Sequence, residues 1–104
     1  MTEQTHTESN EDIVVVEFSK PYHFEGKVYE KLEIDFGELK GRDLERVKKE
    51  WTAGGNFAAV TSVDQTYCAL IACRAAGLDQ AFAENLPAKD YIALTSAAQA
   101  FLLG

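Results

Sequence analysis

The sequence predicts an α+β fold, in which an N-terminal β-hairpin is followed by a helical segment of three to four α-helices. Before residue 37 the sequence has a β-branched apolar run at residues 13–18 and alternating apolar and polar residues at 28–36, whereas apolar residues recur at helical spacing after Gly41. The two kinds of element are therefore separated along the chain, as they are in α+β folds. The length of 104 residues suits one domain, which we expect over residues 13–104.

An acidic segment precedes this domain. Residues 1–12 contain no basic residue and no aliphatic residue other than Met1, and they carry four acids: Glu3, Glu8, Glu11 and Asp12. A segment of this composition cannot bury enough apolar surface to offset the entropy of ordering. We therefore expect residues 1–12 to be a disordered acidic tail.

Two strands are predicted next. Residues 13–18 are apolar and rich in β-branched side chains, which favours a strand. Residues 28–36 alternate, so one face of this strand is expected to hold Val28, Leu32, Ile34 and Phe36, and the other Tyr29, Lys31, Glu33 and Asp35. Glu25 and Gly26 lie between the strands, and glycine accepts the positive φ that a tight turn requires. The two strands are expected to form a hairpin.

The register of this hairpin predicts an irregularity. A two-residue turn at Glu25 and Gly26 pairs Val16 with Asp35, which sets apolar side chains against acidic ones. A shift of one residue moves every side chain of a strand to the other face and restores the agreement. Pro21 has no N–H to donate, so it is the natural place for a bulge. We expect the first strand to be irregular there.

The first helix is predicted to begin after Gly41. Its apolar residues follow an i, i+3, i+7 pattern: Leu44, Val47 and Trp51. Gly54 and Gly55 are expected to end it. Trp51 lies on the apolar stripe, so we expect it to be buried against the hairpin, at Leu32, Ile34 or Phe36.

Further helices follow. Residues 61–64 resemble a capping box and open a helix that is expected to end at Gly77. Phe82 and Leu86 belong to a short turn or helix. Pro87 suits the first turn of a last helix, whose apolar stripe is Tyr91, Leu94, Ala98, Phe101 and Leu102.

The composition argues against several classes of function. A net charge of −7 repels phosphate backbones, so nucleic-acid binding is not expected. No apolar run is long enough for a membrane span, and the first residues do not have the pattern of a signal peptide, so we expect a cytoplasmic protein without a membrane partner. Cys68 and Cys73 lie five residues apart on one predicted helix, too far for a disulfide, and supply only two of the four ligands that zinc usually needs.

The sequence offers little for catalysis. Its histidines are His6 in the acidic tail and His23 beside the turn, and neither has a nucleophile or an orienting carboxylate in a recognisable motif. No phosphate-binding glycine motif occurs. The expectation is a protein that is not an enzyme and has no cofactor or metal. The basic residues 40–49 are interleaved with acids, so we favour a solvated helix face with an i, i+4 pair, Glu45–Lys49, over a nucleic-acid patch.

The end of the sequence is a candidate for partner binding. All alanines lie after Trp51, where only six charged residues remain, so apolar surface is either left uncovered or packed into a tight core. Phe101, Leu102 and Leu103 are consecutive, and three successive helical positions span about 200°. At least one of them is expected to be exposed, and Leu103 lies off the apolar stripe. It is then available to a partner or to a second copy of the chain, unless it is simply a frayed end.

The chain resembles the small tail assembly chaperones of tailed phages, nearest to the Mu-like contractile-tail group. The resemblance covers residues 14–103 and is carried by the order and spacing of six segments: 19–27, 32–36, 41–44, 67–77, 86–91 and 100–102. The sequence departs from the family around residues 54–57, where such proteins vary, and the role of this loop is open.

The resemblance implies a non-enzymatic role. Such chaperones bind the tape measure protein in the host cytoplasm and keep it soluble while tail tube subunits polymerise around it, and they are not retained in the virion. The expected partners are therefore the tape measure protein and, secondarily, the tail tube protein, with self-association as a further option. The alternative is a small structural component of the phage tail or head that stays in the particle.

Overall fold

A computed structural model describes residues 13–56 and 64–103, which adopt the predicted α+β fold. Strands β1 (Ile13–Phe24) and β2 (Lys27–Asp35) form an antiparallel two-stranded sheet. A short 3-10 turn, η1 (Phe36–Glu38), connects this hairpin to four helices: α2 (Gly41–Ala53), α3 (Gln65–Ala76), α4 (Gln80–Glu84) and α5 (Ala88–Leu103). The acidic tail, residues 1–12, lies outside the described residues.

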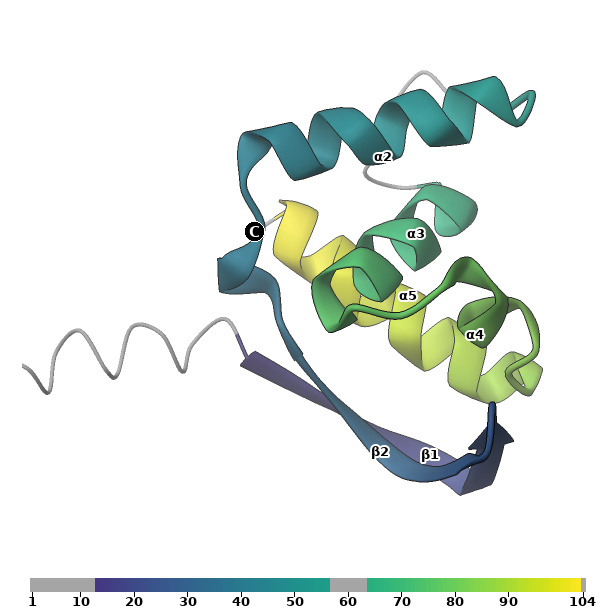
Figure 1. The fold of residues 1–104 in the computed structure, drawn as a ribbon. Coiled ribbons are helices and arrows are strands. Elements are labelled where there is room, and N and C mark those ends of the chain that lie inside the picture. The colour runs from purple at the N-terminus through teal and green to yellow at the C-terminus, as the bar shows by residue number, and fades with distance from the viewer. Residues whose placement is uncertain (1–12, 57–63, 104) are drawn as a thin grey trace, which may run out of the picture.

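The helices lie on one side of the hairpin, and α3 is at the centre of the packing (Figure 1). It contacts α2, α4, α5 and β2, while α5 also packs against β1. Helix α2 and the hairpin lie on opposite sides of α3 and α5. The core draws its largest fully buried side chains from every layer: Phe36, Phe82, Ile34, Ile71, Leu94, Val47 and Cys68. The outward face of β1 exposes Ile13 and Val15.

The irregularity predicted in the first strand is confirmed. Pairing runs from Ile13↔Asp35 to Glu17↔Lys31 and resumes at Tyr22↔Tyr29, so residues 18–21 of β1, Pro21 among them, lie opposite Glu30 alone. The register therefore shifts by three residues rather than by the predicted one. Because three is also odd, the shift still brings the apolar sides of the two strands to one face.

The face predicted for the start of β2 is wrong. Val28 is 57% exposed, whereas Tyr29 is half-buried and its ring centroid lies 5.0 Å from that of Phe82. Glu30 and Lys31 are both exposed, so β2 changes face between Tyr29 and Leu32. The physical reason is that Tyr29 pairs with the buried Tyr22. Burial of an aromatic ring at this position removes more apolar surface from water than burial of a valine, and so stabilises the fold more.

The turn follows its prediction. Glu25 and Gly26 both have positive φ, 48° and 81°. Two such residues between antiparallel strands make the turn type whose twist matches that of a hairpin. Glycine at the second position adopts this conformation without strain, whereas Glu25 is held in it by the strands on either side.

The helices begin and end close to the predicted residues. Gly54 caps the C-terminus of α2, and Gly77, which has a φ of 73°, caps that of α3. Helix α3 is capped by Asp64, whose side chain accepts a hydrogen bond from the Tyr67 N–H at 2.9 Å. The predicted capping box placed the start of this helix at Thr61, which lies outside the described residues. The helix instead begins at Gln65, because the Asp64 carboxylate satisfies its first turn.

Trp51 is buried as predicted, with 3% of its surface exposed. The ring that packs on it comes from α3 rather than from the hairpin: Tyr67 meets it edge-on, with ring centroids 5.6 Å apart. Phe36, one of the expected partners of Trp51, instead stacks on Phe101 of α5. Helix α5 thus takes the position beside the hairpin that the sequence analysis assigned to α2.

Removal of residues 1–12 is expected to change the free energy of unfolding by less than about 0.5 kcal/mol, because the segment consists of charged and polar residues with no aliphatic side chain other than Met1. Urea denaturation of the truncated and full chains measures this difference. A large fall in the unfolding midpoint would show that the tail docks tightly on the domain.

Candidate functional site

Helix α5 presents an exposed face that has almost no charge. Its buried side holds Asp90, Leu94, Thr95 and Ala98. The opposite side, which we call the α5 outer face, consists of exposed residues: Ala88, Lys89, Ile92, Ala93, Ser96, Ala100 and Leu103. Ile92 is 54% exposed and Leu103 is 59% exposed. A helix face in water ordinarily carries charged side chains, so an uncharged one with exposed apolar residues indicates a partner site.

The three predicted partner-binding residues do not share one surface. Phe101 is half-buried and stacks on Phe36, with ring centroids 5.0 Å apart and planes inclined by 16°. Leu102 is also half-buried and packs against the core. Leu103 alone is exposed, as the sequence analysis expected of at least one of the three.

Ile92 belongs to the same face and was missed. It lies eleven residues before Leu103, and eleven residues make about three helical turns, so the two side chains project in the same direction. The signal was present in the sequence, since no charged residue occurs from Tyr91 to Leu103. The predicted apolar stripe lies on the other side of the helix and does not include Ile92.

A buried carboxylate holds the first turn of α5 to the hairpin. Asp90 is 2% exposed, and both of its oxygens accept hydrogen bonds from Ser19. The Ser19 backbone N–H donates to Oδ1 at 2.9 Å, and the Ser19 hydroxyl donates to Oδ2 at 3.1 Å. A carboxylate is also favoured in the first turn of a helix by the helix dipole. With Phe101 stacked on Phe36 at the other end, α5 is fixed at both ends with its outer face toward solvent.

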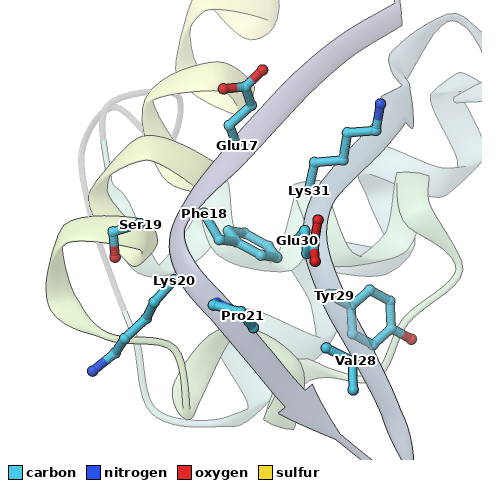
Figure 2. A pocket seen from close by; sticks show the side chains of 9 residues that line it. All are labelled: Glu17, Phe18, Ser19, Lys20, Pro21, Val28, Tyr29, Glu30 and Lys31. Atoms are coloured by element: carbon cyan, nitrogen blue, oxygen red, sulfur yellow. The ribbon is translucent and has the colours of Figure 1, made fainter.

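The irregular part of the hairpin forms an open groove of about 770 Å³ (Figure 2). It is lined by residues of both strands: Glu17, Phe18, Ser19, Lys20, Pro21, Val28, Tyr29, Glu30 and Lys31. The lining acids and lysines balance in charge, and the Ser19 hydroxyl is engaged by Asp90. The sequence predicted the irregularity at Pro21 but not the groove. Its lining gives no charge preference for a ligand.

The thiols are not suited to nucleophilic chemistry. Cys68 and Cys73 are both buried. Burial raises the pKa of Cys73 to about 11, and burial also raises the pKa of Cys68, so both remain protonated at neutral pH. Within residues 13–56 and 64–103 there is no group of three or more metal-ligating side chains. None of the helices described there has the length and apolarity needed to span a bilayer.

One ion pair joins α2 to α3 in the described part of the chain. The Arg74 guanidinium donates to Asp43 Oδ1 from two nitrogens, at 2.8 and 3.1 Å, and the Lys40 backbone N–H donates to Oδ2 at 2.9 Å. The Lys40 N–H, followed by the Arg74 guanidinium, lowers the pKa of the Asp43 carboxyl. The predicted Glu45–Lys49 pair is not formed among these residues, because both long side chains remain in solvent.

Asp43→Asn is expected to destabilise the fold at neutral pH but not in acid. A carboxyl whose pKa is lowered by folding stabilises the native state fully at pH values above its pKa in the unfolded chain, near 3.8. This stabilisation is lost as the pH falls through the lower pKa of the folded state. The difference in unfolding free energy between the variant and the unmodified chain should therefore vanish in strong acid. Urea denaturation across a pH series measures it, with Glu45→Gln as the control. A difference that does not vary with pH would contradict the assignment.

No protein-family model, curated protein or solved structure matches the chain. The functional interpretation therefore depends on the surfaces just described. Of these, the α5 outer face is uncharged apart from Lys89 and exposes large apolar side chains. The lining of the hairpin groove is balanced in charge.

Proposed function

We propose that the protein is a phage tail assembly chaperone, not an enzyme, which binds the tape measure protein through the α5 outer face and keeps it soluble during tail assembly. The observation that supports this proposal is the exposure of Ile92 and Leu103 at the two ends of the uncharged part of the α5 outer face. A tape measure protein is largely long helix, and an apolar helix face is a suitable surface for another helix. Ala93, Ser96 and Ala100 lie between the two large residues, and their small side chains permit close approach of a partner backbone.

The fold supports such a role in two ways. Helix α5 is held at one end by the Ser19–Asp90 hydrogen bonds and at the other by the Phe36–Phe101 stack, so the outer face needs no rearrangement before binding. None of the chain's acids belongs to this face, and the net charge of −7 favours solubility of a complex whose partner is prone to aggregate.

Co-expression with the tape measure protein tests the proposal. Ile92→Glu and Leu103→Glu are each expected to weaken binding by about tenfold, because a charge is then forced into an apolar contact. The amount of soluble tape measure protein should fall accordingly. Thr52→Glu places the same charge at an exposed position of α2 and serves as the matched control. All three variants should retain the circular dichroism spectrum and melting midpoint of the unmodified chain.

The outcomes separate the candidate roles. Undiminished rescue of the tape measure protein by both variants, with unchanged oligomer size in light scattering, would reject the α5 outer face as the binding surface. Mass spectrometry of purified particles distinguishes a chaperone from the alternative, a structural component of the tail or head. A chaperone is expected to be absent from the mature particle, and its retention there would favour the structural role.

A further inference from the structure

Helix α2 concentrates positive charge on a protein that is otherwise acidic. Half of the chain's ten basic residues lie within residues 40–49, and all five are exposed: Lys40, Arg42, Arg46, Lys48 and Lys49. Arg42, Arg46 and Lys49 follow an i, i+4, i+7 spacing, which places them on the side of α2 opposite the buried Val47 and Trp51. We call these three residues the α2 basic stripe.

This stripe has no ion-pair partner in the described part of the chain. The nearest acid in sequence to Arg42 is Asp43, but its carboxylate is bound to Arg74 and to the Lys40 N–H. Glu45 is exposed, and it forms no ion pair with Lys49 in residues 13–56 and 64–103. The positive charge of the stripe is therefore available to a negatively charged occupant.

We propose that residues 1–12 of this chain occupy the α2 basic stripe. This segment carries four acids and no base, so its charge is complementary to that of the stripe. It joins the domain at Ile13, which pairs with Asp35 of β2. Seven steps along the chain separate Asp35 from Arg42, so their Cα atoms lie at most about 25 Å apart, while twelve residues can extend up to about 40 Å. The segment is thus long enough to reach Arg42, at the N-terminal end of the stripe.

The covalent link between residues 1–12 and the domain makes their contact with the α2 basic stripe effective, although each ion pair in it is weak. Exposed ion pairs add little to folding stability, which is compatible with the small effect expected from removing the segment. Because the segment is covalently joined to the domain, its acids are nevertheless held at about a millimolar effective concentration near α2. The segment then competes with any free polyanion for the stripe, and so shields the cationic surface of α2 from nucleic acid.

Paramagnetic relaxation tests the contact directly. A spin label at Thr5→Cys is selective, because Cys68 and Cys73 are buried. At low salt, the amide signals of α2 are expected to lose intensity at least about twofold more than those of α5, and this difference should disappear in about 0.5 M NaCl. The matched control neutralises the segment with Glu3→Gln, Glu8→Gln, Glu11→Gln and Asp12→Asn, and it should abolish the effect. Equal broadening over all helices, or broadening that survives neutralisation, would overturn the proposal.

A short DNA duplex tests the shielding. The chain lacking residues 1–12 is expected to bind the duplex at low salt at least about tenfold more tightly than the full chain. Arg42→Gln, Arg46→Gln and Lys49→Gln together in the truncated chain should remove this gain, which separates the stripe from the change in net charge. Equal binding by the full and truncated chains would overturn the shielding and, if tight, assign the stripe to nucleic acid instead.

Discussion

Phe82→Ala is expected to lower the free energy of unfolding by about 3–5 kcal/mol, because it leaves a cavity at the contact between the helices and the hairpin. Phe82 is fully buried on the short helix α4. Four rings of the hairpin surround it, with centroid distances between 5.0 and 6.1 Å: Phe18, Tyr22, Phe24 and Tyr29. One residue of α4 therefore joins both strands to the helical layer.

Urea denaturation measures this effect, and the near-ultraviolet circular dichroism of the tyrosines reports on the same cluster. Phe82→Leu keeps most of the buried volume and is the matched control, with an expected loss smaller than that of the alanine variant. The hydrogen bond from the Tyr22 hydroxyl to the Phe82 carbonyl, 2.9 Å long, involves the backbone and survives both substitutions. A loss below about 1 kcal/mol for Phe82→Ala would mean that the hairpin is not held by this cluster.

Trp51→Ala is expected to cost about 3–5 kcal/mol as well, by removing the largest side chain between α2 and α3. Trp51 is 3% exposed and packs edge-on against Tyr67. Since it is the chain's single tryptophan, its emission reports on this site alone, and burial predicts a blue-shifted maximum. Emission like that of free indole in water would contradict the packing described for α2.

Trp51→Phe is the informative control for this substitution. The buried Nε1–H of Trp51 has no acceptor among the residues that the structure describes, so its removal relieves an unsatisfied donor. We expect the phenylalanine variant to lose clearly less stability than the alanine variant, because most of the ring contact with Tyr67 is retained. Equal losses for the two variants would show that the indole N–H is satisfied in solution.

Local patterns in the sequence were sufficient for the order of elements and for the irregularity in β1. A hairpin with one continuous register would place apolar side chains opposite acidic ones, so the pairing had to shift by an odd number of residues. Pro21, which has no N–H to donate, indicated where the shift occurs. The orientation of Val28 and Tyr29 could not be predicted in the same way, because it depends on Phe82, which is more than fifty residues away in sequence. Period-two patterning contains no information on which ring a distant helix will supply.

The candidate site, too, could be predicted from the sequence only in part. The exposure of Leu103 follows from its helical position, whereas a single isoleucine at position 92 next to a buried apolar stripe gives no sign by itself that it is exposed. The run of β-branched residues at the start of β1 also indicates which of its side chains are exposed. Consecutive apolar residues in a sheet covered on one side must expose every second one, and Ile13 and Val15 are the exposed ones.

The hydrogen bonds between Ser19 and Asp90 have a consequence for synthesis of the chain. They join residues 71 positions apart, and β1 packs against α5, which the ribosome makes last among the described elements. The hairpin can form early, but the layer that covers it emerges only after α2, α3 and α4 have been made. Contacts of such large sequence separation slow folding, so the nascent chain carries an uncovered apolar sheet until α5 has been made.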